Sequence, residues 1–408
     1  MAHSRAHNAG FHSLFTHIDS EMLQVGLFQL FLNLGKNLIG LSVIFHMYTN
    51  LNYEIWEILT FFLFWQIPFM ITVPFVGKFI EKVGLKHALS TRAIGSISIY
   101  MAFIFILNEN LVQSIIWMMP IFVIRAFFRN SSEVAYDIFL SHYLNKKSKG
   151  QSVAWMQIAI TMATVIAPVL GAFITNWFGL NAVSILAILF VIIGGIVLYY
   201  TPDEKFETNY NSQKLIKDTA FKTPINLFIA EWGRVFFDCM LWLVWPIFLI
   251  LALKDLVSSG LLIGISSGIS MIIAFFIGKK IDKNKKDNKQ ILKHGAWRSS
   301  FLNFFRAIWI EPLTLSVIDA LSKINDQTIK VPYNVEFYKW VHKKNTIERI
   351  HSRWVITEYY YTIQIGIFAC LFAFFENSPM SVFILIFSTG SLFLIFTTKI
   401  SKLETVKK

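Results

Sequence analysis

The sequence predicts an all-α integral membrane protein with twelve transmembrane helices, arranged as two pseudo-symmetric bundles of six. Three observations support this prediction: a very apolar composition, an alternation of basic and nearly uncharged connections, and an internal repeat. Of the 408 residues, 55% are hydrophobic and only 15% are charged, whereas a soluble domain carries roughly 25% charged residues. The apolar runs are continuous and long enough for helical crossings of about 20 residues, which excludes a transmembrane β-barrel.

The first half of the chain contains six apolar runs joined by short connections. They cover about residues 21–48, 55–79, 86–107, 112–144, 150–176 and 181–200. A polar linker follows, and the second half has clear runs at about residues 226–252, 257–278, 349–375 and 378–399. We therefore divide the chain into an N-terminal tail (1–20), a first bundle (21–200), a linker (201–225), a second bundle (226–400) and a C-terminal tail (401–408).

The segment 291–340 is harder to assign, because only its first part, about 296–310, is as apolar as a membrane-spanning helix. The remainder carries Asp319, Lys323, Asp326 and Lys330. Both flanking connections are basic, so the chain has to cross the membrane an even number of times between them. We expect two crossings, of which the second begins at Glu311-Pro312, is amphipathic and is shielded from lipid. Two half-inserted segments are the alternative.

The net charge of +12 is distributed over the connections. Six basic clusters hold 27 of the 37 lysines and arginines, at residues 77–92, 145–149, 201–222, 279–294, 339–353 and 399–408. The short connections between them hold one, Lys254. This alternation follows the positive-inside rule and predicts a plasma (inner) membrane protein with both termini in the cytoplasm. It also argues against a nucleic-acid partner.

Other classes of site are not visible in the sequence. Cys239 and Cys370 both lie in apolar runs and indicate neither a disulfide nor a metal site. No phosphate-binding loop of the form Gly-x-x-x-x-Gly-Lys-Ser/Thr occurs. The first 20 residues lack the apolar core of a cleaved signal peptide. We expect no enzymatic activity, no cofactor and a monomeric protein.

The two halves share features at nearly the same spacing, which indicates a duplicated six-helix unit. The segment Gly77-Lys-Phe-Ile-Glu81-Lys82-Val-Gly84 follows the second apolar run, and Gly278-Lys-Lys-Ile-Asp282-Lys283 follows the eighth, 201 residues later. Gly35-Lys36 in the first run matches Gly233-Arg234 in the seventh, 198 residues later.

The first of these segments resembles a signature of the major facilitator superfamily of secondary transporters. The signature, Gly-x-x-x-Asp-Arg/Lys-x-Gly-Arg/Lys-Arg/Lys, lies between the second and third helices. The chain departs from it at Glu81 and at Leu85. The resemblance implies a gate that latches the two halves in the outward-facing state. Its residues would be Gly77, Glu81, Lys82, Gly84 and Lys86, together with Gly278, Asp282 and Lys283 of the second copy. A basic loop that only fixes the orientation is the alternative.

Polar residues within the first predicted helix are candidates for substrate binding. Asn33, Lys36 and Asn37 fall, with Gln29, within about a third of the helix circumference. A charge in the membrane interior normally faces a water-filled cavity or an opposite charge. This helix is therefore expected to line a cavity.

Arginines in two further helices complete the predicted substrate site. They are Arg125 and Arg129 in the fourth helix and Arg234 in the seventh. Guanidinium groups hold carboxylates and phosphates in bidentate geometry, so we expect an anionic or zwitterionic substrate. An ion pair between Arg129 and Glu133 is the structural alternative.

Three carboxylates are candidates for proton coupling: Glu231, Asp238 and Glu358. Glu231 and Asp238 lie three and four residues from Arg234, so either could exchange the arginine for a proton. A self-neutralising structural cluster is the alternative. Desolvation would favour the protonated form of Glu358, whereas pairing with Arg353 would make it structural.

We therefore expect a secondary active transporter that moves a small solute by alternating access between two rocking bundles, coupled to protons. Its partners would be the solute, protons and membrane lipids. Two other functions stay open. One is a non-transporting receptor or assembly protein on the same scaffold, and the other is a lipid or lysolipid flippase.

Overall fold

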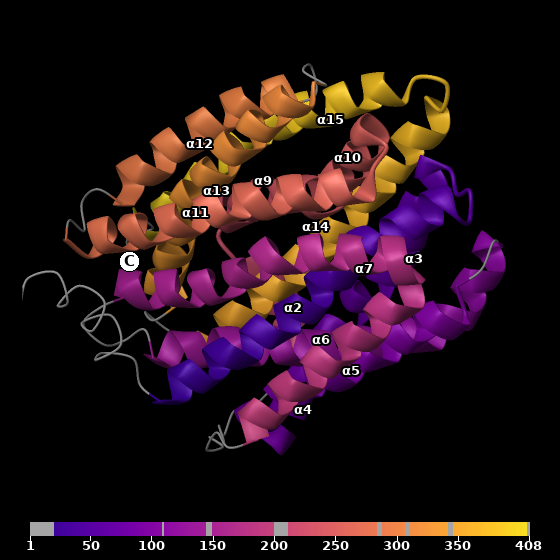
Figure 1. Ribbon diagram of the computed structural model, residues 1–408. Coiled ribbons are helices and arrows are strands. Elements are labelled where there is room, and N and C mark those ends of the chain that lie inside the picture. The colour runs from indigo at the N-terminus through magenta and orange to yellow at the C-terminus, as the bar shows by residue number, and fades with distance from the viewer. Residues whose placement is uncertain are drawn as a thin grey trace, which may run out of the picture.

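The computed structural model describes residues 20–107, 110–143, 149–199, 211–283, 288–306, 311–341 and 346–405, and every element in these ranges is helical. Figure 1 shows long helices packed side by side, with the first half of the chain, indigo to magenta, below the second half, orange to yellow. The described helices make twelve passes, as predicted.

The first half provides six passes. The first is α2 (Ser20–Thr49), and the second combines α3 (Ile55–Thr72), a 3₁₀ turn η1 (Val73–Phe75) and α4 (Val76–Val83). The third and fourth are α5 (Leu85–Phe105) and α6 (Leu111–Tyr143). The fifth and sixth are the two parts of α7 (Lys149–Tyr199), which Gly179 separates with φ 78°. Glycine adopts a positive φ without steric cost, so it allows the chain to reverse there.

The second half begins with a short helix in the linker, α8 (Ser212–Lys222). The seventh pass combines α9 (Ile225–Cys239), a π-helical turn η2 (Met240–Val244) and α10 (Trp245–Leu253). The next four are α11 (Leu256–Lys283), α12 (Asn288–Arg306), α13 (Pro312–Val341) and α14 (Thr346–Phe374). The twelfth is α15 (Pro379–Leu394), continued by the 3₁₀ helix η3 (Ile395–Thr405).

Two passes are too polar to be recognised by their hydropathy. Nine segments of the described residues are long and apolar enough to cross a membrane, and α12 and α13 are not among them. Both are nevertheless full helices, and α13 begins at Pro312 as expected. Their charged side chains pair with each other: Arg306 of α12 binds Asp319 of α13, and both side chains are fully buried. These two buried charges are thus neutralised within the protein, whereas Lys293 and Arg298 of α12 are exposed, and the two helices supply the expected pair of passes.

The two ends of the molecule differ in how the halves meet. We call the end where α4 turns into α5 at Gly84 the basic end, and the end where α2 turns into α3 the opposite end. Towards the opposite end, α11 packs closely on α7. A Cβ atom on Gly260 would lie 2.7 Å from the carbonyl oxygen of Pro168, and one on Gly264 would lie 2.6 Å from that of Val165. Glycines therefore allow the two halves to close here.

The structure corrects two sequence-based boundaries. The second pass extends to Val83, so Glu81 and Lys82 lie on α4 rather than in a loop, and the connection to α5 is reduced to Gly84, with φ 88°. The linker was expected to be merely polar, but α8 packs against η1 and α14, where Thr219 donates a hydrogen bond to Ser352 (2.9 Å). Asn211 caps its N-terminus by accepting from two backbone amides.

Candidate functional site: a charged cavity between the two halves

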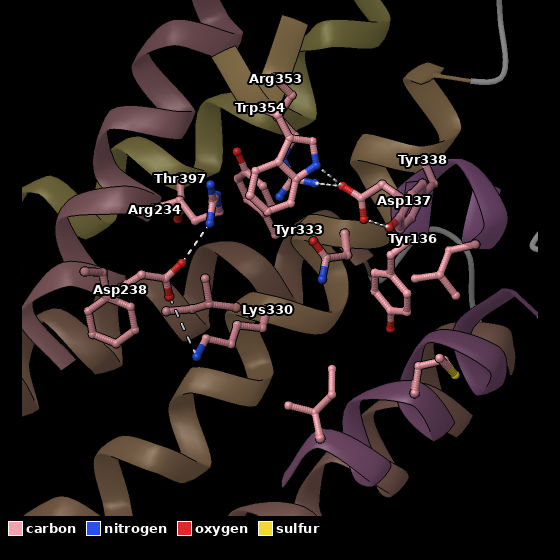
Figure 2. Close-up of a pocket in the computed structure, with 16 residues that line it drawn as sticks. Tyr136, Asp137, Arg234, Asp238, Lys330, Tyr333, Tyr338, Arg353, Trp354 and Thr397 are labelled. Atoms are coloured by element: carbon pink, nitrogen blue, oxygen red, sulfur yellow. Dashed lines mark hydrogen bonds and ion pairs between the residues drawn. The ribbon is translucent and has the colours of Figure 1, made fainter. Parts of the chain in front are cut away.

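A cavity of about 260 Å³ lies between the halves towards the basic end. Helices α6 and α7 of the first half and α9, α13 and α14 of the second contribute to its wall. Its charged lining residues are Asp137, Arg234, Asp238, Lys330 and Arg353 (Figure 2). Such a volume is sufficient for a small solute and is just below the usual range for drug-sized ligands.

Glu231 lies behind the residues that line the cavity and accepts hydrogen bonds from four side chains. Its carboxylate is fully buried and accepts hydrogen bonds from Arg234 (2.7 Å), Arg353 (2.8 Å), the Tyr333 hydroxyl (2.7 Å) and the Thr357 hydroxyl (3.1 Å). Two guanidinium groups from α9 and α14 thus share one carboxylate. This arrangement fixes α9, α13 and α14 relative to one another.

Asp238 forms the second acidic group of the cavity. Arg234 Nη1 lies 2.7 Å from Asp238 Oδ2, and Lys330 Nζ lies 3.8 Å from Asp238 Oδ1. Figure 2 shows Arg234, Asp238 and Lys330 along one side of the cavity. Arg234 thus binds both Glu231 and Asp238 of the seventh helix, and Arg353 and Lys330 of other helices contribute the further cations.

Asp137 closes the basic end by linking the two halves. Its carboxylate accepts hydrogen bonds from the Tyr338 hydroxyl (2.7 Å) and from Trp354 Nε1 (2.8 Å), and Arg353 Nη1 lies 3.7 Å away. Nearby, His351 Nε2 lies 2.5 Å from the carbonyl oxygen of Val73. Arg353 therefore touches Glu231 within its own half and Asp137 in the other half.

A second charged group, the central cluster, surrounds Glu358 on α14. Glu358 is fully buried; Arg129 of α6 lies 3.4 Å from it, and Gln66 of α3 donates a hydrogen bond to it. Glu133 binds Arg92 (2.6 Å) and lies 4.0 Å from Arg129. Arg129 thus has one carboxylate partner in each half. The pairing with Glu133 that the sequence suggested as an alternative is present, but Arg129 also contacts Glu358. The expected alternative pairing of Glu358 with Arg353 is wrong.

Lys36 and Arg125 belong to the same cluster, and neither forms an ion pair with a carboxylate in the part of the chain that the structure describes. The charges that act on Lys36 are those of Arg129, Arg92, Glu133 and Arg125. Lys36 is exposed although it lies at the middle of α2. The Arg125 guanidinium lies 4.4 Å from the ring centre of Trp65. Its Nε and Nη1 atoms are buried and have no hydrogen-bond partner in the part of the chain that the structure describes.

The predicted asparagines of α2 differ in position. Asn33 is buried and donates to the carbonyl oxygen of Gln29 (2.7 Å), whereas Asn37 is half-buried. Neither lines the cavity near the basic end, and nor do Lys36, Arg125 and Arg129. Of the six predicted substrate residues, the structure therefore brings only Arg234 to that cavity.

The predicted gate is described for its first copy only. Gly77 is buried, Glu81 is half-buried, Lys82 is exposed and Lys86 Nζ lies 5.4 Å from the Tyr199 ring centre. Gly278, Asp282 and Lys283 lie in the last turns of α11, and their side chains fall outside the described residues. Among the described residues, Asp137 and His351 make contacts that join the halves at the basic end.

Sequence reasoning missed several residues of the site. Asp137, Lys330, Tyr333 and Arg353 line the cavity, and the spacing of Asp137 four residues after Glu133 was the only local signal for it. Asp326 is also buried, and its Oδ1 atom has no hydrogen-bond partner among the described atoms. No group of three His, Cys, Asp or Glu side chains in the described ranges could hold a metal ion.

The comparison with known protein families agrees with the helical membrane fold. The family model of the Major Facilitator Superfamily matches residues 25–305. A search of curated proteins found no match.

Proposed function

The chain belongs to the major facilitator superfamily, and on this basis we propose that it is a secondary active transporter that moves a small solute across the plasma (inner) membrane by alternating access. Membership indicates a transporter rather than an enzyme, as the sequence predicted. The basic end would face the cytoplasm, in accordance with the positive-inside rule. The protein would act as a monomer.

The observation that carries this proposal is a charged cavity enclosed between two sets of contacts across the halves. At the basic end, Asp137 binds Tyr338 and Trp354. Towards the opposite end, Gly260 and Gly264 lie against α7. Breaking either set while the other holds would open the cavity to one side only, which is the requirement for alternating access. A fixed receptor has no need for two separable contacts.

Proton coupling is best supported at Glu358. Glu231 and Asp238 are each neutralised by cations of their own half. Glu358 is paired with Arg129 across the halves, so its protonation would release Arg129 and break a contact between them. Exchange of one partner for another is how a buried carboxylate can couple a proton to a movement.

The test uses one cysteine that is approached from both sides of the membrane. Cys239 and Cys370 are first replaced by serine, and Asn334, which lines the cavity, is replaced by cysteine. An impermeant thiol reagent is then applied to right-side-out and to inverted vesicles. Alternating access predicts labelling in both preparations. Labelling in only one preparation would contradict the transport proposal and favour the receptor or assembly protein.

Two exposed positions serve as sidedness controls. Lys222 lies at the end of α8 near the basic end, and Glu376 lies in the connection between α14 and α15 at the opposite end. Each is expected to be labelled in one preparation only, and in opposite ones. These controls also test the proposed orientation.

Replacement of Glu358 with glutamine is expected to uncouple transport from protons. The amide keeps the size of the side chain but cannot carry the charge that holds Arg129. In proteoliposomes, exchange of the solute should continue, while accumulation driven by a pH gradient should fall at least about tenfold, corresponding to about 1.4 kcal/mol. The control is Glu376→Gln at an exposed site. Equal pH-driven accumulation in both variants would exclude Glu358 as the coupling residue.

A further inference from the structure

Apart from the Glu336–Lys339 pair of α13, the charges between the described helices form three groups, and one of these three is unbalanced. Around the cavity, Arg234, Lys330 and Arg353 face Glu231, Asp238 and Asp137. Between α12 and α13, Arg306 and Lys323 face Asp319, with Asp326 two turns beyond Asp319 along α13. Both groups contain as many carboxylates as cations.

The central cluster has an excess of positive charge. Within the described ranges, two carboxylates, Glu133 and Glu358, face its four cations, which are Lys36, Arg92, Arg125 and Arg129. Arg92 and Arg129 have carboxylate partners, so the excess of two charges resides on Lys36 and Arg125. An uncompensated charge within a membrane costs several kcal/mol. A counter-charge is therefore missing at this position.

We propose that Lys36 and Arg125 are the binding site for a small dianion, of the phosphate-monoester or dicarboxylate type, and that this dianion is the transported solute. This inference rests on the proposed transport function and adds its substrate class. The two charges of the solute would replace the two carboxylates that the central cluster lacks. Neither residue lines the cavity near the basic end, so the site lies deeper, close to the middle of α2 and α6.

The geometry of Arg125 suits an anion site. Its guanidinium is held against the Trp65 ring at 4.4 Å, and this ring stacks on Phe103 with 5.8 Å between centres. The cation is thus fixed by contacts that leave its charge uncompensated. The buried Nε and Nη1 atoms are two donors without acceptors among the described residues, and such donors are costly unless a ligand occupies them.

The position of Lys36 completes the site. Its side chain is exposed. The charged groups that act on it belong to α5 and α6: Arg92 on α5, and Arg125, Arg129 and Glu133 on α6. Along α6, Arg125 and Asp137 are twelve residues apart, which corresponds to about 18 Å of helix. Arg129, which pairs with Glu358 across the halves, lies between them in the sequence. A dianion at Lys36 and Arg125 would therefore lie beyond the Arg129–Glu358 pair, seen from the basic end.

The experiment compares pairs of ligands that differ by one charge. Thermal unfolding of the purified full-length protein is followed with methyl phosphate against dimethyl phosphate, and with succinate against its monomethyl ester, at equal ionic strength and neutral pH. A bound ligand stabilises the folded state according to its concentration and Kd. We expect the doubly charged member of at least one pair to bind roughly ten- to hundredfold more tightly. The pair that responds identifies the phosphate or the carboxylate chemistry.

Charge-neutral variants test the two residues. Lys36→Gln and Arg125→Gln should each reduce the preference for the dianion by about tenfold or more. The matched controls are Lys293→Gln and Arg298→Gln, because these side chains are exposed on α12. Equal binding of both members of both pairs, or an unchanged preference in Lys36→Gln and Arg125→Gln, would overturn the proposal. Stabilisation by dodecyl phosphate alone would also overturn it and would favour the flippase.

Failure of this inference can be distinguished from failure of transport. The ligand comparison measures binding at equilibrium, whereas labelling of Asn334→Cys from both sides measures access without any ligand. Labelling from both sides without a preference for dianions would leave the transporter intact and remove the substrate class. A preference for dianions with labelling from one side would indicate an anion receptor.

Discussion

Replacing Glu231 with alanine is expected to lower the free energy of unfolding by about 3–5 kcal/mol, which is typical for breaking a buried ion pair by removing one partner. The carboxylate is fully buried and lies between Arg234 and Arg353. Its loss would leave Asp238 and Asp137 as the acidic partners of the two guanidinium groups among the described residues. The hydroxyl of Tyr333 would also lose its acceptor. The measurement is the unfolding midpoint of the purified protein in detergent.

Two comparisons make this expectation specific. Asp218 pairs with Lys222 on the exposed side of α8, so Asp218→Ala should cost no more than about 1 kcal/mol. A double variant, Glu231→Gln with Arg234→Gln, should recover part of the loss, because the carboxylate and one of its cations are removed together. If Glu231→Ala unfolds at the same midpoint as Asp218→Ala, Glu231 does not hold the second half together. Glu231 would then again be a candidate for proton coupling.

Most of the fold could be predicted because membrane insertion leaves a strong record in the sequence. The apolar runs and the alternating basic connections each reflect the cost of burying or translocating charge. The exception was the pair α12 and α13. Their charges are compatible with lipid only because Arg306 and Asp319 neutralise each other, and the sequence shows charges without showing which of them meet. Because the connections on both sides of this segment are basic, the number of crossings between them has to be even, and this requirement predicted two helices where hydropathy did not.

The candidate site was predictable in part, for a similar reason. Position within an apolar run identified Lys36, Arg125 and Arg234, because each charge is costly wherever it points. The partners were not predictable, since contacts such as that of Asp137 with Tyr338 join residues about two hundred positions apart. Asp137 lies near the end of its helix, where a carboxylate is less costly than in the middle of a membrane span and is therefore a weaker indication of function. The linker helix α8 was missed because its polar sequence resembles a loop until Leu215 is seen to pack against Val73 and Val355.

Adding a single methyl group at Gly264 is expected to open the protein towards the opposite end. A Cβ atom there would lie 2.6 Å from both the carbonyl oxygen of Val165 and a methyl carbon of Val169. A backbone oxygen cannot rotate away, so α11 would have to separate from α7. Overpacking of this kind costs typically 1–3 kcal/mol. Because this contact joins the two halves rather than the interior of one, the cost shifts the equilibrium between conformations more than it unfolds either half.

The readout is the labelling rate of a cysteine introduced at Ala172, which is 1% exposed and faces Gly260 across the same contact. In a background without Cys239 and Cys370, Gly264→Ala should raise this rate roughly five- to hundredfold, which is the overpacking cost expressed as a population ratio. Gly268→Ala is the matched control on the same helix, because its Cβ atom would make only an ordinary contact, 3.7 Å from Val165. An equal increase in both variants would mean that helix propensity, and not the contact between the halves, sets the labelling rate.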